Sequence, residues 1–119
     1  MEIKEIICDK FEQYCYDENN EKIKEYLETY DGLANYNNGI YFEIIADKGN
    51  FELLKLFIKH GAQIDIDNNY VLYTCAYLAF YDCLDYLLKY GADIEKIKHS
   101  CGYSNALIFM QQNALTLYK

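Results

Sequence analysis

The sequence predicts an all-α solenoid of about four antiparallel helix pairs with short connecting loops. Three observations lead to this prediction. A pattern of about 30 residues repeats along the chain, apolar residues within each repeat recur at helical spacing, and the 119 residues contain no proline. Proline is the strongest helix breaker, so its absence leaves every segment free to form a helix.

Two central segments repeat each other at a spacing of about 30 residues. Residues 59–65 (KHGAQID) closely match residues 89–95 (KYGADIE), and the same spacing aligns 53–58 with 83–88. Weaker matches extend the period toward both ends, so we expect a single domain without room for a second one. The predicted units are about 1–35, 36–66, 67–97 and 98–119.

Each unit is predicted to contain two helices joined by a polar turn. Apolar residues recur at helical spacing between Ile3 and Cys15, and again between Ile23 and Tyr30. In the second and third units a glycine is placed to end the second helix in the left-handed conformation. The later helices are expected at about 40–47 and 51–60, within 70–90, and from about Ser104 to the end of the chain.

Polar residues replace apolar ones in the two outer units. Lys24 and Glu28 stand at the repeat positions of Leu54 and Ile58, and Asn113 stands at a position that is apolar in the middle units. The end units of a stack face water on one side. This pattern therefore predicts capped ends and a complete domain.

The segments between units are short and polar. Residues 35–39 and 65–69 are rich in Asn, and residues 95–99 are rich in Lys. Asn and Gly favour turns and positive φ angles. We expect these segments to project as loops or short hairpins from one edge of the stack.

Two segments resemble the second helix and exit turn of ankyrin repeats. Residues 49–64 and 81–94 are similar to the family pattern of a Gly-His, two variable residues, an apolar pair, Leu-Leu and a closing Gly-Ala-Asp. The resemblance implies a non-enzymatic role in protein binding. It also implies that partner contacts lie on the concave face, made of loop tips and the first helix of each unit.

The chain departs from the family pattern in two ways. The usual Thr-Pro-Leu-His opening is replaced by residues 40–43 and 70–73, and the period is about 30 rather than 33 residues. These departures leave open whether the loops are hairpins or tight turns. Short, proline-free units rich in Asn, Tyr, Ile and Lys resemble the ankyrin arrays of large DNA viruses and some intracellular bacteria.

The composition excludes several classes of partner. The net charge of −8 argues against nucleic acids and anionic membrane surfaces, because binding to both requires clustered Lys or Arg. No apolar stretch approaches the roughly 20 residues of a membrane span. The five cysteines form an odd count without a Cys-x-x-Cys pair, which indicates a reducing compartment and a cytoplasmic location, including the cytoplasm of a host cell.

The surplus of tyrosine suggests a contact surface. Tyrosine is enriched in binding hot spots, because it offers apolar area with a hydrogen-bonding tip. The alternative is that these tyrosines pack the base of the loops. The predicted contact residues are Tyr36, Asn38, Tyr41, Asp67, Asn69, Tyr70, Tyr73 and Lys98.

Two other functions compete with partner binding. A self-associating scaffold subunit could pair end to end through Ile3, Ile7, Leu115 and Leu117 of the terminal helices. A metal site or a nucleophile pair could use loosely spaced cysteine and histidine residues, although a zinc site needs four ligands. The candidates for such a site are Cys83, His99 and Cys101. We predict no catalytic residue and no cofactor.

Overall fold

The computed structural model describes residues 3–117, and the side chains up to residue 113. Within this range the chain forms seven α-helices and no strand, so the predicted all-α class is confirmed. Two short 3-10 helices, η1 (Leu33–Asn35) and η2 (Ile94–Ile97), lie between units. The α-helices are α1 (Glu5–Tyr16), α2 (Asn20–Thr29), α3 (Tyr36–Lys48), α4 (Phe51–Lys59), α5 (Ile66–Tyr77), α6 (Tyr81–Lys89) and α7 (Gly102–Leu117).

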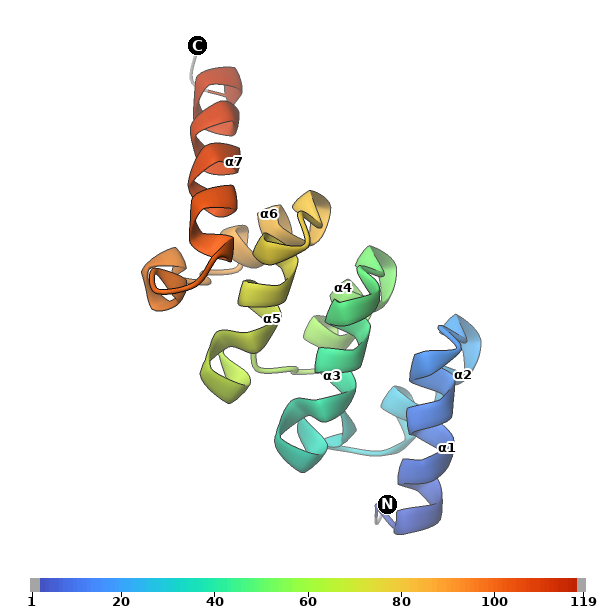
Figure 1. Cartoon of the computed structure of the whole chain (residues 1–119). Coiled ribbons are helices and arrows are strands. Elements are labelled where there is room, and N and C mark those ends of the chain that lie inside the picture. The colour runs from blue at the N-terminus through green and yellow to red at the C-terminus, as the bar shows by residue number, and fades with distance from the viewer. Residues whose placement is uncertain (1–2, 118–119) are drawn as a thin grey trace.

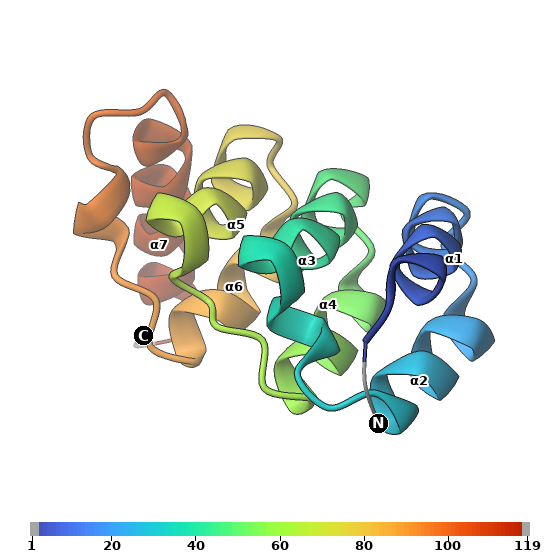
Figure 2. The same ribbon diagram turned by 90° about the horizontal axis from the view of Figure 1, so that it is seen from below.

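The helices form an elongated stack of two layers. Helices α1, α3, α5 and α7 lie side by side in one layer, and α2, α4 and α6 form the layer behind them (Figures 1 and 2). The stack measures 49 × 27 × 22 Å, with α1 and α7 at opposite ends (Figure 1). Neighbours in the first-helix layer pack more closely than neighbours in the second layer.

Equivalent positions of successive units are buried together. A repeat buries its apolar face only against its neighbours, so the same position must be apolar in each unit. Phe57 shows the result, because its ring stacks on Phe42 of its own unit at 5.8 Å and lies 6.0 Å from Phe11 of the preceding unit. The buried columns are Ile23, Leu53 and Cys83; Leu27, Phe57 and Leu87; and Ala46, Ala76 and Ala106.

Local capping interactions fix the ends of several helices. The side chains of Asn19 and Asn50 accept hydrogen bonds from backbone N–H groups in the first turns of α2 and α4, at 3.2 and 3.0 Å. Gly61 and Gly91 follow α4 and α6 with φ angles of 90° and 103°. Glycine adopts such angles without steric cost, so each second helix ends at the predicted place.

The connections between the first three units are left-handed turns rather than hairpins. Residues 37–39 before the regular part of α3 have φ angles of 52°, 57° and 76°, and residues 67–69 in α5 have 52°, 54° and 64°. Asn, Asp and Gly tolerate this conformation better than other residue types. The sequences Asn-Asn-Gly and Asp-Asn-Asn therefore form compact turns that carry the chain directly into the next helix.

The predicted fourth helix pair is wrong. Residues 102–117 form one continuous helix, and within this described segment no residue has a positive φ angle like those of Gly49 and Ala79, which separate the helices of the second and third pairs. The helix begins at Gly102, two residues before the predicted Ser104. A Cβ atom at Gly102 would lie 2.9 Å from the backbone nitrogen of Tyr77, so a glycine lets α7 pack directly on α5.

The polar positions in the first unit face solvent as predicted. Lys24 and Glu28 on α2 are exposed, whereas the equivalent Leu54 and Ile58 on α4 are buried. Asn113 on α7 is half-buried, and its side chain donates a hydrogen bond to the backbone oxygen of Phe109 at 2.8 Å. Charged residues thus stand where no neighbouring helix covers the first unit.

The left-handed turns predict a difference between two glycine variants. Alanine at Gly32 or Gly39 costs about 1 kcal/mol for the positive φ angle alone. At Gly39 the new Cβ would also lie 2.8 Å from the side chain of Ile66 at the start of α5, whereas Gly32 has open space around it. We expect Gly39→Ala to lower the free energy of unfolding by about 1 kcal/mol more than Gly32→Ala. Urea unfolding followed by circular dichroism measures both, and equal losses would contradict the packing of this turn on Ile66.

Candidate functional site

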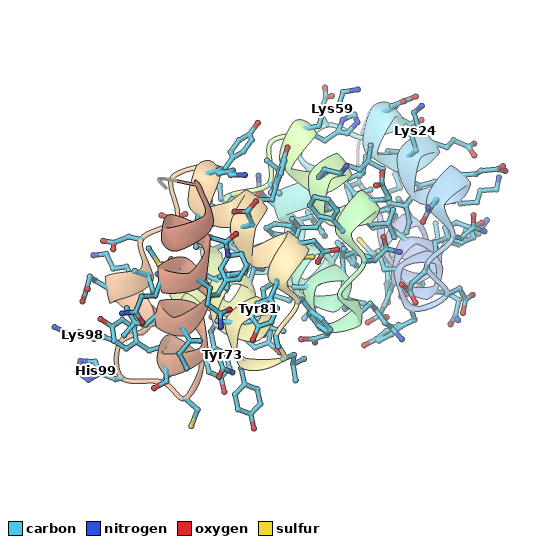
Figure 3. The ribbon with its side chains drawn as sticks, turned by 90° about the horizontal axis from the view of Figure 1, so that it is seen from above. Lys24, Lys59, Tyr73, Tyr81, Lys98 and His99 are labelled. Atoms are coloured by element: carbon cyan, nitrogen blue, oxygen red, sulfur yellow. The ribbon has the colours of Figure 1, made fainter. Side chains whose placement is uncertain are left out.

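Helix α5 carries a row of three tyrosines on the surface of the first-helix layer. Tyr70, Tyr73 and Tyr77 recur every three or four residues, so they lie on one side of the helix. The rings of Tyr73 and Tyr77 stack with centroids 5.6 Å apart, and Tyr70 lies 6.5 Å from Tyr73. Tyr77 is 50% exposed, and the other two are half-buried. Figure 3 shows Tyr73 on the side of the stack opposite Lys24 of the second-helix layer.

Carboxylates of α3 border this row of tyrosines. The hydroxyl of Tyr70 donates a hydrogen bond to Oδ1 of Asp47 at 2.9 Å. One turn earlier on α3, Glu43 lies close to Asp67 in the left-handed turn of α5, and the interaction between the two carboxyl groups raises the pKa of Glu43. The three carboxylates and three tyrosines form one continuous surface, here named the α3–α5 face: Glu43, Asp47, Asp67, Tyr70, Tyr73 and Tyr77.

Glu43 is the most perturbed carboxyl of this face. Burial raises its pKa from the ordinary 4.5 to about 7, helped by the hydrogen bond with Asp67 and by the negative charges of Asp67 and Asp47. Its Oε1 is the one buried side-chain oxygen or nitrogen in the described part of the chain that has no hydrogen-bond partner. An unsatisfied acceptor of this kind costs stability, so Glu43 is held in an unfavourable setting by the packing around it.

The carboxylates of the α3–α5 face have no lysine partner. Three Lys–carboxylate ion pairs occur among residues 3–113, and each is formed within a single helix of the second-helix layer. They are Lys22–Glu25 on α2, Lys55–Glu52 on α4 and Lys89–Asp85 on α6. The negative charge of the face is therefore uncompensated by the protein's own lysines.

The structure brings together four of the predicted contact residues and separates the others. Asp67, Asn69, Tyr70 and Tyr73 lie along the start of α5. Tyr36 and Asn38 occupy the equivalent turn at the start of α3, and both are exposed. Lys98 is exposed after η2, beside His99 and near the start of α7 (Figure 3).

The prediction that Tyr41 contacts a partner is wrong. Only 4% of its surface is exposed, and its ring meets that of Phe11 edge to face at 4.9 Å. Burial and a hydrogen bond with Cys8 raise the pKa of its hydroxyl. The repeat gives the reason, because the position equivalent to Tyr41 in the third unit is the buried Val71.

Three residues of the α3–α5 face are missing from the predicted contacts. The 30-residue spacing could have found them, since it places Glu43 opposite Tyr73 and Asp47 opposite Tyr77. These pairs occupy outward positions of the first helices, next to the buried alanine column. An acidic pair and an aromatic pair therefore stand at the same repeat positions of neighbouring units.

Two grooves lie between neighbouring units. One, of about 580 Å³, separates the left-handed turn of α5 from the turn before η2, and Asn69 at its border adjoins Tyr70 of the α3–α5 face. Its lining residues are Ile64, Asp65, Asn68, Asn69, Gly91, Ala92, Asp93 and Lys96. The other, of about 470 Å³, lies in the second-helix layer between α4 and α6 and is lined in part by Tyr86 and Tyr90.

The structure does not assemble the cysteine–histidine site considered from the sequence. Cys83 is fully buried beside Cys75, and a hydrogen bond between the two thiols, together with burial, raises the pKa of Cys75. His99 and Cys101 are exposed. Across the described range, no three His, Cys, Asp or Glu side chains could hold a metal ion together. Over the same range, no helix is both long and apolar enough to cross a membrane.

Where the structure describes them, the apolar residues predicted to mediate self-association are only partly exposed. Ile3 and Ile7 are half-buried, and the side chains of Leu115 and Leu117 lie outside the described residues. Other apolar side chains are exposed at the two ends of the stack. They are Ile6 on α1 and Leu107, Ile108 and Met110 on α7.

A comparison with protein families agrees with the geometry. A family model described as ankyrin repeats, in three copies, matches residues 12–98. This range runs from within α1 to the end of η2 and contains the whole α3–α5 face. Comparisons with curated proteins and with solved structures give no match.

The raised pKa of Glu43 predicts a stability that falls as pH rises. The folded state keeps the proton up to about pH 7, whereas the unfolded chain releases it near the ordinary value of 4.5. The protonated carboxyl therefore contributes its full stabilisation below pH 4.5, and this contribution is lost as pH rises toward 7.

Glu43→Gln keeps the shape of the side chain and stays neutral at every pH. We expect this variant to unfold at a higher urea concentration than the wild type at pH 8, and at the same urea concentration as the wild type at pH 4.5. Glu28→Gln, at an exposed site on α2, serves as the control, and a constant offset for Glu43→Gln across this range would contradict the raised pKa.

Proposed function

Because the chain belongs to the ankyrin repeat family, whose members are generally protein–protein interaction modules, we propose that it is an adaptor or inhibitor that binds a partner protein through the α3–α5 face. The family is typically non-enzymatic, and the proposal assigns no catalytic residue. We place its action in the cytoplasm. The free cysteines Cys15, Cys75 and Cys83 support this location, because buried unpaired thiols are typical of a reducing compartment.

The row of tyrosines is the observation that carries the proposal. Tyr73 and Tyr77 stack on each other, and Tyr70 is fixed by its hydrogen bond to Asp47. Side chains that are already ordered lose little entropy on binding, so their apolar area contributes more to affinity. The outer surface of the first helices also matches the surface on which the family resemblance places partner contacts.

Truncation of the tyrosines tests the proposed face. We expect Tyr73→Ala with Tyr77→Ala to weaken binding at least about tenfold, because central aromatic contacts often contribute about 2 kcal/mol. The partner would be captured with the tagged protein, identified by mass spectrometry, and its affinity measured with purified components. Tyr90→Ala, directly after α6, is the matched control, since Tyr90 is 56% exposed on the second-helix layer. Wild-type affinity in a folded double variant would remove the α3–α5 face from the proposal.

Self-association through the stack ends is a second candidate function. Leu107, Ile108 and Met110 expose apolar surface on α7, and Ile6 does so on α1, so two copies could bury these surfaces end to end. We expect light scattering over a concentration series to show a rise in mass that Ile108→Ser abolishes. A mass that stays monomeric up to millimolar concentration would contradict this function and leave the partner-binding proposal intact.

A further inference from the structure

We propose that the α3–α5 face takes a basic segment of the partner, with a Lys or Arg side chain whose cationic group meets the carboxylates and whose stem lies on the tyrosines. This inference rests on the proposed function, because it specifies the chemistry of the partner for the same surface. Two features of the face support it: its uncompensated charge, and a row of tyrosines of which Tyr77 is exposed and Tyr70 and Tyr73 are half-buried.

The charge of the face lacks a counterpart within the fold. Helix α5 contains no lysine, and neither does the sequence of α7. The one lysine of α3, Lys48, lies at the end of the helix with its Nζ 5.9 Å from the ring centroid of Tyr16. A cation from another molecule therefore meets no competing lysine at Glu43, Asp47 or Asp67.

Glu43 carries a carboxyl whose ionised form a nearby cation would stabilise. Its Oε1 is buried and has no hydrogen-bond partner within the described residues, so a cation bound at the surface acts on this carboxyl through its electric field rather than by a direct hydrogen bond. The groups facing Glu43 are Asp47 on its own helix and Asp67 and Tyr70 on α5. These neighbours supply negative charge and a phenol, so a bound cation favours the ionised carboxyl and releases its proton near neutral pH.

The aromatic half of the face suits the rest of a basic side chain. A cation is attracted to the face of a tyrosine ring, and the aliphatic stem of Lys or Arg packs on the same apolar surface. The protein contains this arrangement elsewhere. The Nζ of Lys55 lies 4.4 Å from the centroid of the Phe51 ring and 3.2 Å from Oε1 of Glu52. The α3–α5 face presents the same two components, carboxylate and ring, and lacks the cation.

A short arginine peptide tests the inference directly. The probe is a fluorescein-labelled hexapeptide of alternating Gly and Arg, and its control carries citrulline in place of each Arg. Fluorescence anisotropy at low salt measures binding to the wild type and to two triple variants, each of which removes three negative charges. The site variant is Glu43→Gln, Asp47→Asn, Asp67→Asn, and the control variant is Glu21→Gln, Glu28→Gln, Asp31→Asn, at exposed positions in and after α2.

The expected result separates a site from general attraction to an acidic protein. The site variant should weaken Arg-peptide binding at least about tenfold, and the control variant less than about twofold. Equal losses in the two variants, or equal binding of the citrulline peptide, would overturn the inference. Circular dichroism checks that the variants fold.

Glu43→Gln alone keeps the test decisive if the triple variant unfolds. Binding to the wild type should strengthen as pH rises from 5.5 to 8, because the cation favours the ionised carboxyl, and the single variant should remove most of this dependence. An unchanged pH profile would overturn the inference.

Failure of the inference is also distinguishable from failure of the proposed function. Capture of the partner that depends on Tyr73 and Tyr77 but ignores the carboxylates would keep the function and reject a basic partner segment.

Discussion

The stack depends on each unit burying its apolar face against the next unit. No helix pair in this chain is large enough to enclose a core of its own, so the core runs continuously from Phe11 through Phe57 to Leu87. The alanine column in the first helices shows how this constraint acts on individual residues. Ala46, Ala76 and Ala106 are fully buried, and their small side chains allow the first helices to approach closely. The polar positions Lys24 and Glu28 follow from the same constraint, since no helix of the described residues covers that side of α2.

The compact left-handed turns shape the surface that the stack presents. A hairpin would extend away from the first helices, whereas the turns at residues 37–39 and 67–69 keep the chain close to α3 and α5. Asp67 therefore lies within reach of Glu43 on the neighbouring helix. Asp67 thus has two effects. It helps to form the left-handed turn, and it adds a carboxylate to the exposed side of the first-helix layer.

The α3–α5 face combines rigidity with unsatisfied charge. Its tyrosines are ordered by stacking and by the bond from Tyr70 to Asp47, and its carboxylates repel one another without a lysine to balance them. Lysines of α2, α4 and α6 pair with carboxylates of their own helices, whereas no lysine pairs with these carboxylates among residues 3–113.

The sequence by itself determined the repeat, the pairing of helices in the first three units and the residues that cap them. These features depend on local patterns, such as the Gly-Ala pair after α4 and α6 or the Asn before α2 and α4, and such patterns act over a few residues. Tertiary structure alone decided that Tyr41 is buried, that α7 continues without a turn, and that Glu43 meets Asp67. Each of these outcomes depends on how closely neighbouring units approach and which side of a helix they cover. The helical period indicates which residues share a side, but only the packing of α3 against α1 and α5 determines which side remains open to a partner.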